Sequence, residues 1–309
     1  MKPANLNFIS VGSKTFLLGE YAALEQAPAL LACTKPRFYL EIKPKSHRYE
    51  PHFAQFDLAS PAGKYLAKHY QEFKNYELDF FDPHFGKGGL GASGAQFILV
   101  YIAHQCTILG KDPKTIPIDL IKNSYLRHAY RGLGKAPSAY DIYAQTLGNL
   151  AFIDPQNKLA QTQKWPFDKL AFLLVRTGIK ISTHEHLKFI KNINAEPLEK
   201  ITRFGYNALS KKNARQFIEA VYQYQIALQE QKFTHEKTLQ LLKKIRCNRY
   251  VHAVKGCGAL GADVLLILCD KEKFEDLTNW LNLDGIKIVA SSEQLTAGLM
   301  IEKSRQAAV

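Results

Sequence analysis

The sequence predicts an α+β fold divided into two lobes. The chain has 309 residues, enough for two lobes or one large one. Strand-like patterns dominate the first third of the chain, whereas long helical patterns follow residue 195. A polar segment with turn residues, PQNKLAQTQKW, follows Asp154. We therefore expect an N-terminal lobe over residues 1–154 and a C-terminal lobe over residues 155–309.

The first lobe is expected to be rich in strands, with helices in its second half. Ser60 and Pro61 form an N-cap followed by proline at the first helical position. Apolar residues recur at helical spacing from Ala95 onward. The expected elements are strands within 6–24, at 37–44 and at 76–82, helices from 61, from 95 and over 119–132, then a short helix and a strand within 136–154.

The second lobe is expected to alternate strands and helices. Its most distinctive segment is YVHAVKGCGALGADVLLILCD (250–270), which reads as strand, glycine turn and strand. The other expected elements are a strand at 169–178, helices over 196–209, 213–230, 234–245 and 273–281, and a strand at 286–291.

Composition indicates a soluble globular protein. Hydrophobic residues make up 46% of the chain and charged residues 22%, which argues against disorder. Asn5, Lys14 and Glu20 interrupt any signal-peptide core, and no apolar run is long enough to span a membrane, so we expect a cytoplasmic protein without a membrane partner. The five cysteines lack a CxxC pair, which argues against a disulfide framework or a structural zinc site and favours buried free thiols.

The formal net charge of +13 is compatible with nucleic acid, an acidic membrane surface or anionic small molecules. The basic residues are spread in pairs and accompany no nucleic-acid-binding motif. This distribution favours a solvated surface, so we expect a small-molecule substrate and no nucleic-acid partner.

The segment GKGGLGASGA (86–95) concentrates glycines at the start of a predicted helix. Glycines let a backbone approach a ligand closely, and the first N–H groups of a helix attract an anion such as phosphate. A tight strand-to-helix turn explains the glycine count equally well. The segment lacks the GKS or GKT ending of a P-loop and the order of a dinucleotide-binding motif.

Four motifs, in order, resemble those of the GHMP kinases, the family of galactokinase, homoserine kinase, mevalonate kinase and phosphomevalonate kinase. GGLGASGA resembles the GLGSSAA phosphate loop, and VGSKTFLLGEYAAL resembles the amino-terminal signature. GKAPSAYDIYAQTLGN is similar to the segment with the SGxD aspartate, and AVKGCGALGADVLLIL to the carboxy-terminal glycine motif. TGIKISTHEHL (177–187) is also like a stretch of the mevalonate-pathway members, so the resemblance spans residues 11–268.

The resemblance implies a two-lobed fold with an N-terminal nucleotide-binding lobe and a C-terminal ferredoxin-like α/β sandwich. It also implies an ATP- and Mg²⁺-dependent kinase that acts on a small molecule, as a monomer or homodimer. Tyr21 of the GEY turn and Asp263 lean toward phosphomevalonate, slightly ahead of mevalonate, as the acceptor.

The resemblance also assigns roles to residues of this chain. Lys14 and Asp141 match the catalytic lysine and aspartate, although a surface lysine and a helix cap are the alternatives for residues of these types. Ser93 matches the Mg²⁺ or phosphate contact. The residues expected at the nucleotide are Gly88, Gly89, Leu90, Gly91, Ala92, Ser93, Gly94 and Ala95, and those expected at the acceptor are Glu20, Ser138, Lys255, Gly258, Ala259 and Asp263. For Glu20, and for Thr183 in the fifth motif, a buried structural role is the alternative.

Several positions depart from the family pattern, among them Phe85 in place of a proline. Ala92 replaces a serine, and Ala139, Leu260 and Ala262 replace glycines. Three alternatives stay open: a GHMP kinase for another alcohol or sugar, a diphosphomevalonate decarboxylase, and a ligand sensor without turnover, which these departures motivate. The joint retention of Lys14, Ser93 and Asp141 argues against the sensor.

Overall fold

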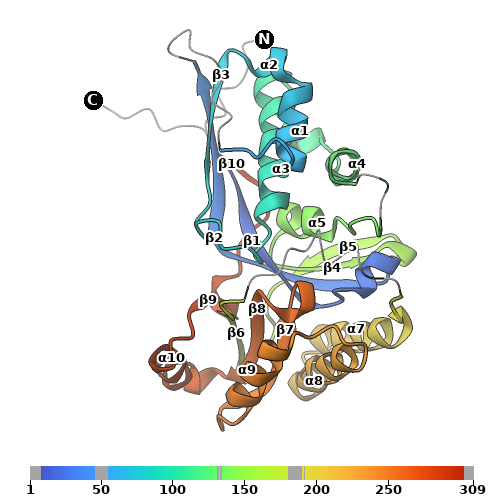
Figure 1. Cartoon of the computed structure of the whole chain (residues 1–309), viewed down its shortest axis with the longest axis vertical. Helices are drawn as coiled ribbons and strands as arrows, with labels where there is room; N and C mark the ends of the chain where they lie inside the picture. Colours follow the sequence, from blue (N-terminus) through green and yellow to red (C-terminus); the bar gives the residue numbers. More distant parts are fainter. Residues whose placement is uncertain are drawn as a thin grey trace.

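A computed structural model of the chain describes residues 8–45, 55–130, 132, 134–179, 190 and 192–302. These residues form two lobes, each built on a β-sheet (Figure 1). Within the described residues the N-terminal sheet has six strands in the order β10-β1-β2-β4-β5, with β3 pairing the outer part of β2. The strands are β1 (Phe8–Leu18), β2 (Ala29–Pro44), β3 (Tyr76–Phe81), β4 (Leu150–Asp154), β5 (Leu159–Gln163) and β10 (Met300–Glu302).

The helices of the N-terminal lobe pack against this sheet and against one another. The helices of this lobe are α1 (Pro61–Lys68), α2 (Tyr70–Phe73), α3 (Ala92–Ile102), α4 (Ile118–Ala129) and α5 (Tyr140–Leu147). Helix α3 is the central one, because its apolar residues from Phe97 to Ile102 are buried against β1, β2 and α1. The predicted cap of α1 is confirmed, since Gly63 donates its N–H to Ser60 Oγ at 3.0 Å.

The C-terminal sheet is antiparallel and has the order β7-β8-β6-β9. Its strands are β6 (Leu170–Arg176), β7 (Val251–Cys257), β8 (Val264–Asp270) and β9 (Ile288–Ser291). Its helices are α7 (Ala195–Ser210), α8 (Ala214–Glu230), α9 (Glu236–Arg246) and α10 (Phe274–Leu283). This order of strands and helices is the ferredoxin-like arrangement, so the predicted sandwich is confirmed.

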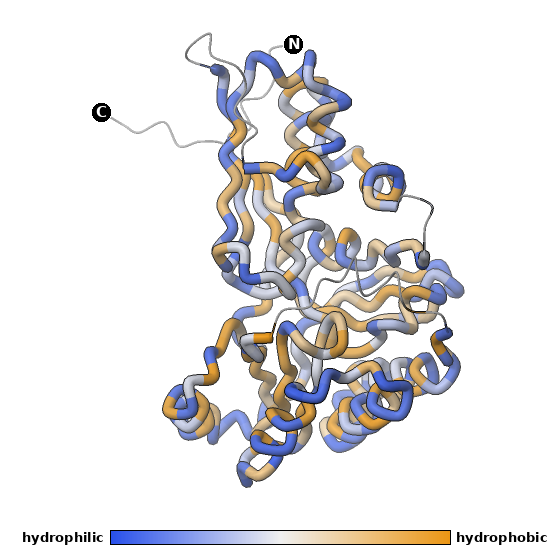
Figure 2. Tube along the Cα trace, viewed as in Figure 1, coloured by the Kyte–Doolittle hydropathy of each residue, from blue (hydrophilic) through white to orange (hydrophobic). Residues whose placement is uncertain are grey.

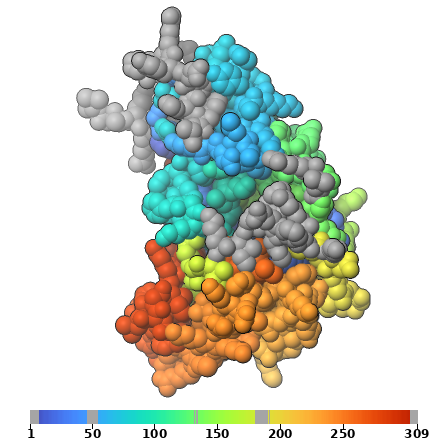
Figure 3. Space-filling model, viewed as in Figure 1, coloured from blue at the N-terminus to red at the C-terminus, as the bar shows by residue number. Residues whose placement is uncertain are grey.

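One apolar core joins the two sheets. Leu30 and Phe152 of the N-terminal sheet, Phe172 of β6 and Phe217 of α8 belong to the same buried cluster. Figure 2 shows apolar residues concentrated on the inner strands and polar residues on the outer helices. Figure 3 shows the N-terminal elements forming one end of the molecule and α8, α9 and α10 the other. The core therefore fixes the position of the lobes relative to each other.

Two strands from the predicted C-terminal lobe, residues 155–309, belong to the N-terminal sheet. Strand β5 lies in the segment expected to be a polar connection, and it pairs with β4. Strand β10, near the end of the described chain, pairs with β1. The residues of β5 are polar because an edge strand exposes its side chains, and the period-2 signal of a half-buried strand is then missing. Strand pairing thus draws residues from both sides of residue 154 into one sheet.

Two further expectations need correction. Helix α3 begins at Ala92 rather than near Ala95, because Gly91 ends the loop in the left-handed region and accepts the N–H of Ala95 at 2.9 Å. Four cysteines are buried as expected, but Cys247 is exposed. Among the described residues no helix combines the length and the apolar character that crossing a membrane requires.

Candidate active site

The glycine loop packs tightly against residues that come from distant parts of the chain. Gly91 has φ +86°, and a Cβ built on it would lie 2.7 Å from Cγ of Lys14 and 3.1 Å from Nε2 of Gln145. A Cβ on Gly89, at φ +88°, would lie 2.4 Å from Cβ of Asp263. Only glycine fits both the backbone conformation and the space at these two positions.

Lys14 and Asp141 face each other beside the first turn of α3. Lys14 Nζ lies 3.9 Å from Asp141 Oδ2, and both side chains keep partial contact with solvent. The backbone N–H of Lys14 donates to the carbonyl of Leu90 at 3.0 Å, which ties β1 to the glycine loop. A Cβ on Gly94 would lie 3.4 Å from Asp141 Oδ2, so the carboxylate borders the loop as well. The structure thus brings both predicted catalytic residues to the start of α3.

The C-terminal lobe contacts the glycine loop through β6. Arg176 donates from Nη1 to the carbonyl of Lys87 at 2.6 Å and to that of Gly88 at 3.3 Å. Burial lowers the pKa of Arg176, whereas the charges of Asp82 and Asp263 raise it. Sequence analysis missed Arg176, because the contact joins residues 88 and 89 positions apart and no local pattern marks it.

Two residues that replace family glycines keep a glycine-like backbone. Ala139, at the N-cap of α5, has φ 57°, and Leu260, in the turn between β7 and β8, has φ 51°. Both values lie in the left-handed region that favours glycine. Ala139 and Leu260 therefore adopt the backbone conformation that glycine would adopt at these positions.

A cavity of about 820 Å³ opens between the glycine loop, α1, α4, α5 and the turn after β7. Its charged lining residues include Lys64 and Lys135 as well as Asp57 and Asp141, so the charge is mixed. The predicted site residues that line it are Lys14, Glu20, Gly88, Gly89, Gly91, Ala92, Ser93, Gly94, Ser138, Asp141, Gly258, Ala259 and Asp263.

Three predicted residues lie elsewhere. The side chains of Leu90 and Ala95 are buried in the apolar cores, so these residues contribute to the glycine loop only through their backbone. Lys255 is fully buried and is not part of the cavity wall. The fifth motif begins at Thr177, whose N–H donates to Asp263 O at 3.3 Å, but its residues 180–187, with Thr183, lie outside the described residues.

Lys255 forms a buried ion pair with Glu20 across the two lobes. Lys255 Nζ donates to Glu20 Oε1 and to the carbonyl of Gly256 at 2.9 Å. Burial raises the pKa of the Glu20 carboxyl, and the charge of Lys255 opposes this shift. Lys255 thus has a structural role: its ion pair with Glu20 links β7 to the residues that follow β1.

We expect Lys255→Met to destabilise the fold strongly, because Glu20 would lose its buried counter-charge. Loss of one partner of a buried pair costs about 3–5 kcal/mol, whereas an exposed pair contributes about 0–1 kcal/mol. Lys135→Met is the matched control, since Lys135 pairs with Glu25 at the partly exposed rim of the cavity. Urea unfolding measures both free energies, and equal losses in the two variants would contradict this assignment.

His84 supports the segment before the glycine loop. Ser13 donates its hydroxyl to the carbonyl of Pro36 at 2.7 Å and therefore accepts from His84 Nε2 at 2.6 Å. Burial, reinforced by the charge of Arg176, lowers the pKa of His84 from 6.5 to about 4. His84 is therefore neutral in the folded chain near neutral pH.

This low pKa predicts a pH-dependent stability. The unfolded chain takes up the His84 proton near pH 6.5, but the folded chain does so only near pH 4. The free energy of unfolding should therefore fall as the pH falls from about 6.5 to about 4. In His84→Gln the loss over this interval should be smaller, because the other titrating groups are unchanged. Parallel stability curves for the parent and the variant, from urea unfolding at several pH values, would refute the prediction.

Comparisons with known proteins complete the description of the site. No protein-family model and no curated protein matches the sequence. Several solved structures resemble the chain over nearly its whole length. A mevalonate kinase from Methanococcus jannaschii has a TM-score of 0.69 at 18% identity, covering 94% of this chain and 98% of its own. A phosphomevalonate kinase from Streptococcus pneumoniae, in complex with phosphomevalonate and AMPPNP, has a TM-score of 0.72 at 20% identity, covering 92% and 98%.

A galactokinase from Lactococcus lactis, complexed with galactose, is similar at a TM-score of 0.71 and 12% identity, covering 95% of this chain and 94% of its own. The three relatives act on different acceptors, so what they have in common with this chain is the architecture. Together with the glycine loop, the two sheets and their topology, these matches show that the chain has the two-lobed α+β fold of the GHMP kinases.

Proposed function

We propose that the chain is an ATP-dependent small-molecule kinase that transfers the γ-phosphoryl group of ATP to an acceptor held in the 820 Å³ cavity. The observation that carries the proposal is the meeting of the glycine loop, Lys14 and Asp141 at the first turn of α3. Backbone N–H groups at such a turn bind phosphate, and the glycines leave room for its close approach.

Lys14 has the position of a transition-state stabiliser. Its ammonium group lies beside the loop and 4.9 Å from the centre of the Phe16 ring, within the cavity wall. During transfer the bond between the γ-phosphorus and the bridging oxygen breaks, a bond to the acceptor oxygen forms, and ADP leaves. Charge develops on the phosphoryl oxygens, where a fixed cation is most effective.

Asp141 has the position of a base or of a group that orients the acceptor. Its carboxylate lies on the cavity wall within 3.9 Å of Lys14 Nζ. An alcohol acceptor must lose a proton as its oxygen bonds to phosphorus, and in this proposal the Asp141 carboxylate takes it. With an alcohol acceptor the pair would thus supply a cation for the phosphoryl oxygens and a base for the acceptor proton.

The residues at the mouth of the loop also fit Mg²⁺. Ser93 is exposed in the first turn of α3 and lines the same cavity as Asp141, and Mg²⁺ prefers few protein oxygens of this kind. Bound there with the nucleotide, Mg²⁺ would neutralise charge on the phosphate oxygens. Ser93 is the residue of this chain that would hold it.

Phosphomevalonate is the acceptor we place slightly ahead of mevalonate. The support comes from the sequence motifs around Tyr21 and Asp263 and from the similarity to a phosphomevalonate kinase. The mixed charge of the cavity discriminates little between the two acceptors. Another alcohol or sugar, or diphosphomevalonate with decarboxylation, stays the alternative on the same scaffold.

An assay of ADP release from ATP and Mg²⁺ tests the proposal. The acceptors are mevalonate, phosphomevalonate, diphosphomevalonate, homoserine and galactose, each offered separately. We expect turnover with phosphomevalonate or mevalonate and its loss in Lys14→Met, which also controls for contaminating kinases. An absence of turnover with every acceptor would favour a ligand sensor instead.

A further inference from the structure

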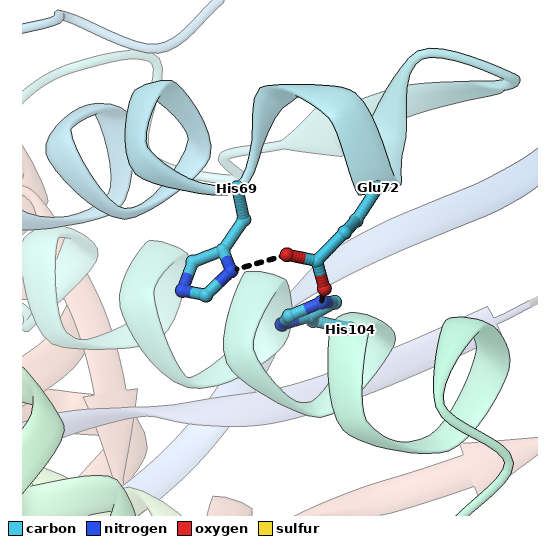
Figure 4. Close-up of side chains that lie close together, drawn as sticks. All are labelled: His69, Glu72 and His104. Atoms are coloured by element: carbon cyan, nitrogen blue, oxygen red, sulfur yellow. Dashed lines mark hydrogen bonds and ion pairs between the residues drawn. The ribbon is translucent and has the colours of Figure 1, made fainter.

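A cluster of two histidines and one glutamate lies in the N-terminal lobe, outside the cavity. His69 Nδ1 lies 2.9 Å from Glu72 Oε1, and His104 Nε2 lies 2.5 Å from Glu72 Oε2. One atom from each residue can be chosen so that all three lie within 4.8 Å of one another. Figure 4 shows the Glu72 carboxylate between the two imidazole rings, with one oxygen facing His69 and the other facing His104.

The three side chains come from two segments that the fold brings together. His69 follows the last residue of α1, and Glu72 is in the short helix α2. His104 lies in the π-helical turn Ala103–Ile108 that continues α3. Such π-helical turns occur frequently at functional sites, because the extra residue redirects a side chain.

A second contact orients the buried histidine. Tyr65 OH lies 2.7 Å from His104 Nδ1, so the other ring nitrogen, Nε2, points toward Glu72. Histidines that bind metals almost always use their second nitrogen in a hydrogen bond of this kind. The His104 side chain is 2% exposed, whereas that of Glu72 is 43% exposed, so the cluster is fixed on one side and open to solvent on the other.

We propose that His69, Glu72 and His104 bind a transition-metal ion, Zn²⁺ being the best match. Two imidazole nitrogens and one carboxylate oxygen are zinc ligands, whereas Mg²⁺ favours oxygen alone. Ligands bound at about 2.0–2.1 Å in a tetrahedral site lie about 3.4 Å apart. Small movements of the partly exposed His69 and Glu72 side chains would bring the three ligand atoms to this spacing, and water would complete the open fourth position.

Zinc at this site would join the end of α1 to α3. The opposite end of α1 lines the cavity through Ser60, Pro61 and Lys64. The ion would therefore hold in place a helix that shapes the cavity, without itself touching the reactants. The proposal is independent of the kinase assignment, since the three ligands are not among the residues of the cavity wall. It also departs from the expectation of no zinc site, which considered the cysteines alone.

Calorimetric titration of the tag-free, chelator-treated chain with Zn²⁺ tests this site in the absence of nucleotide. The Cys247→Ser background removes the exposed thiol. We expect one Zn²⁺ per chain, a rise in Tm on binding, and no competition from millimolar Mg²⁺. In Glu72→Gln and His69→Gln, which change partly exposed side chains, Zn²⁺ affinity should fall by at least about 10-fold, the lower end of the loss when a residue that only orients a metal ligand is changed.

His252→Gln is the matched control, because His252 Nε2 lies 2.8 Å from Asp270 Oδ1 in an exposed pair outside the cluster. This variant should bind Zn²⁺ like its parent. Co²⁺ in place of Zn²⁺ should give the visible absorption of a four-coordinate site in the parent and lose it in Glu72→Gln. Failure of the parent to bind Zn²⁺ saturably, or unchanged affinity in both cluster variants, would overturn the proposal and leave the three residues as a hydrogen-bonded network.

Discussion

Asp141→Asn is expected to lower kcat by roughly 10²- to 10⁴-fold if the acceptor is an alcohol, the usual scale for losing a general base. The substitution keeps the size of the side chain and removes the charge that lies 3.9 Å from Lys14 Nζ. A phosphate acceptor should respond differently. The second pKa of a phosphate monoester is about 6, so the attacking oxygen is already mostly ionised at neutral pH and needs no base.

The size of the effect therefore separates mevalonate from phosphomevalonate. With phosphomevalonate the loss should be smaller and reflect the positions of Lys14 and the acceptor. Asp57→Asn is a suitable control, because Asp57 also lines the cavity, and asparagine keeps an acceptor for the N–H of Ala59. Steady-state rates of parent and variants with both acceptors give the comparison, and an Asp141→Asn enzyme as fast as its parent with each acceptor would remove Asp141 from the mechanism.

Gly91→Val should abolish nucleotide binding while the chain stays folded. A side chain at residue 91 would meet Lys14 and Gln145 at 2.7 and 3.1 Å, so it would displace the lysine and fill the space that the phosphates need. Left-handed backbone in a residue with a Cβ also costs roughly 1–2 kcal/mol. Calorimetric titration with ATP and Mg²⁺ measures the loss of binding, and circular dichroism checks the fold.

Gly86→Val shows whether the lost space or the backbone strain prevents nucleotide binding. Gly86 has φ +71°, but a Cβ built on it meets no atom within 4 Å. This variant should carry a similar backbone strain and bind nucleotide nearly as well as the parent. If Gly91→Val also kept its affinity in the folded state, the glycines would serve only the turn.

Local signals in the sequence predict much of the fold. The Ser60 cap, the glycines of the loop and the strand, turn and strand around Gly258 are each set by neighbouring residues, and all three are present. Strand β5 carries no such signal, because an edge strand needs no apolar side. Strand β10 has only three residues, and its place beside β1 depends on a pairing across nearly the whole chain.

The candidate site likewise has features that the sequence predicts and features that only the fold brings together. The glycines predict a tight turn or a phosphate loop before α3, and the family resemblance decides between the two; the approach of Lys14 to Asp141 follows from that resemblance alone. Arg176 and the cluster of His69, Glu72 and His104 depend on contacts between distant segments, which no periodicity encodes. Lys255 matches a family motif, yet its side chain points into the interior toward Glu20 rather than into the cavity.

A crystal structure with AMPPNP, Mg²⁺ and an acceptor tests the central claim most directly. We expect the phosphates to lie at the backbone N–H groups of residues 89–93, with the γ-phosphorus between Lys14 Nζ and the acceptor oxygen, and that oxygen within hydrogen-bond distance of Asp141. Phosphates bound more than one helical turn from residues 89–93, or an acceptor remote from Lys14 and Asp141, would contradict the assignment of this site to phosphoryl transfer.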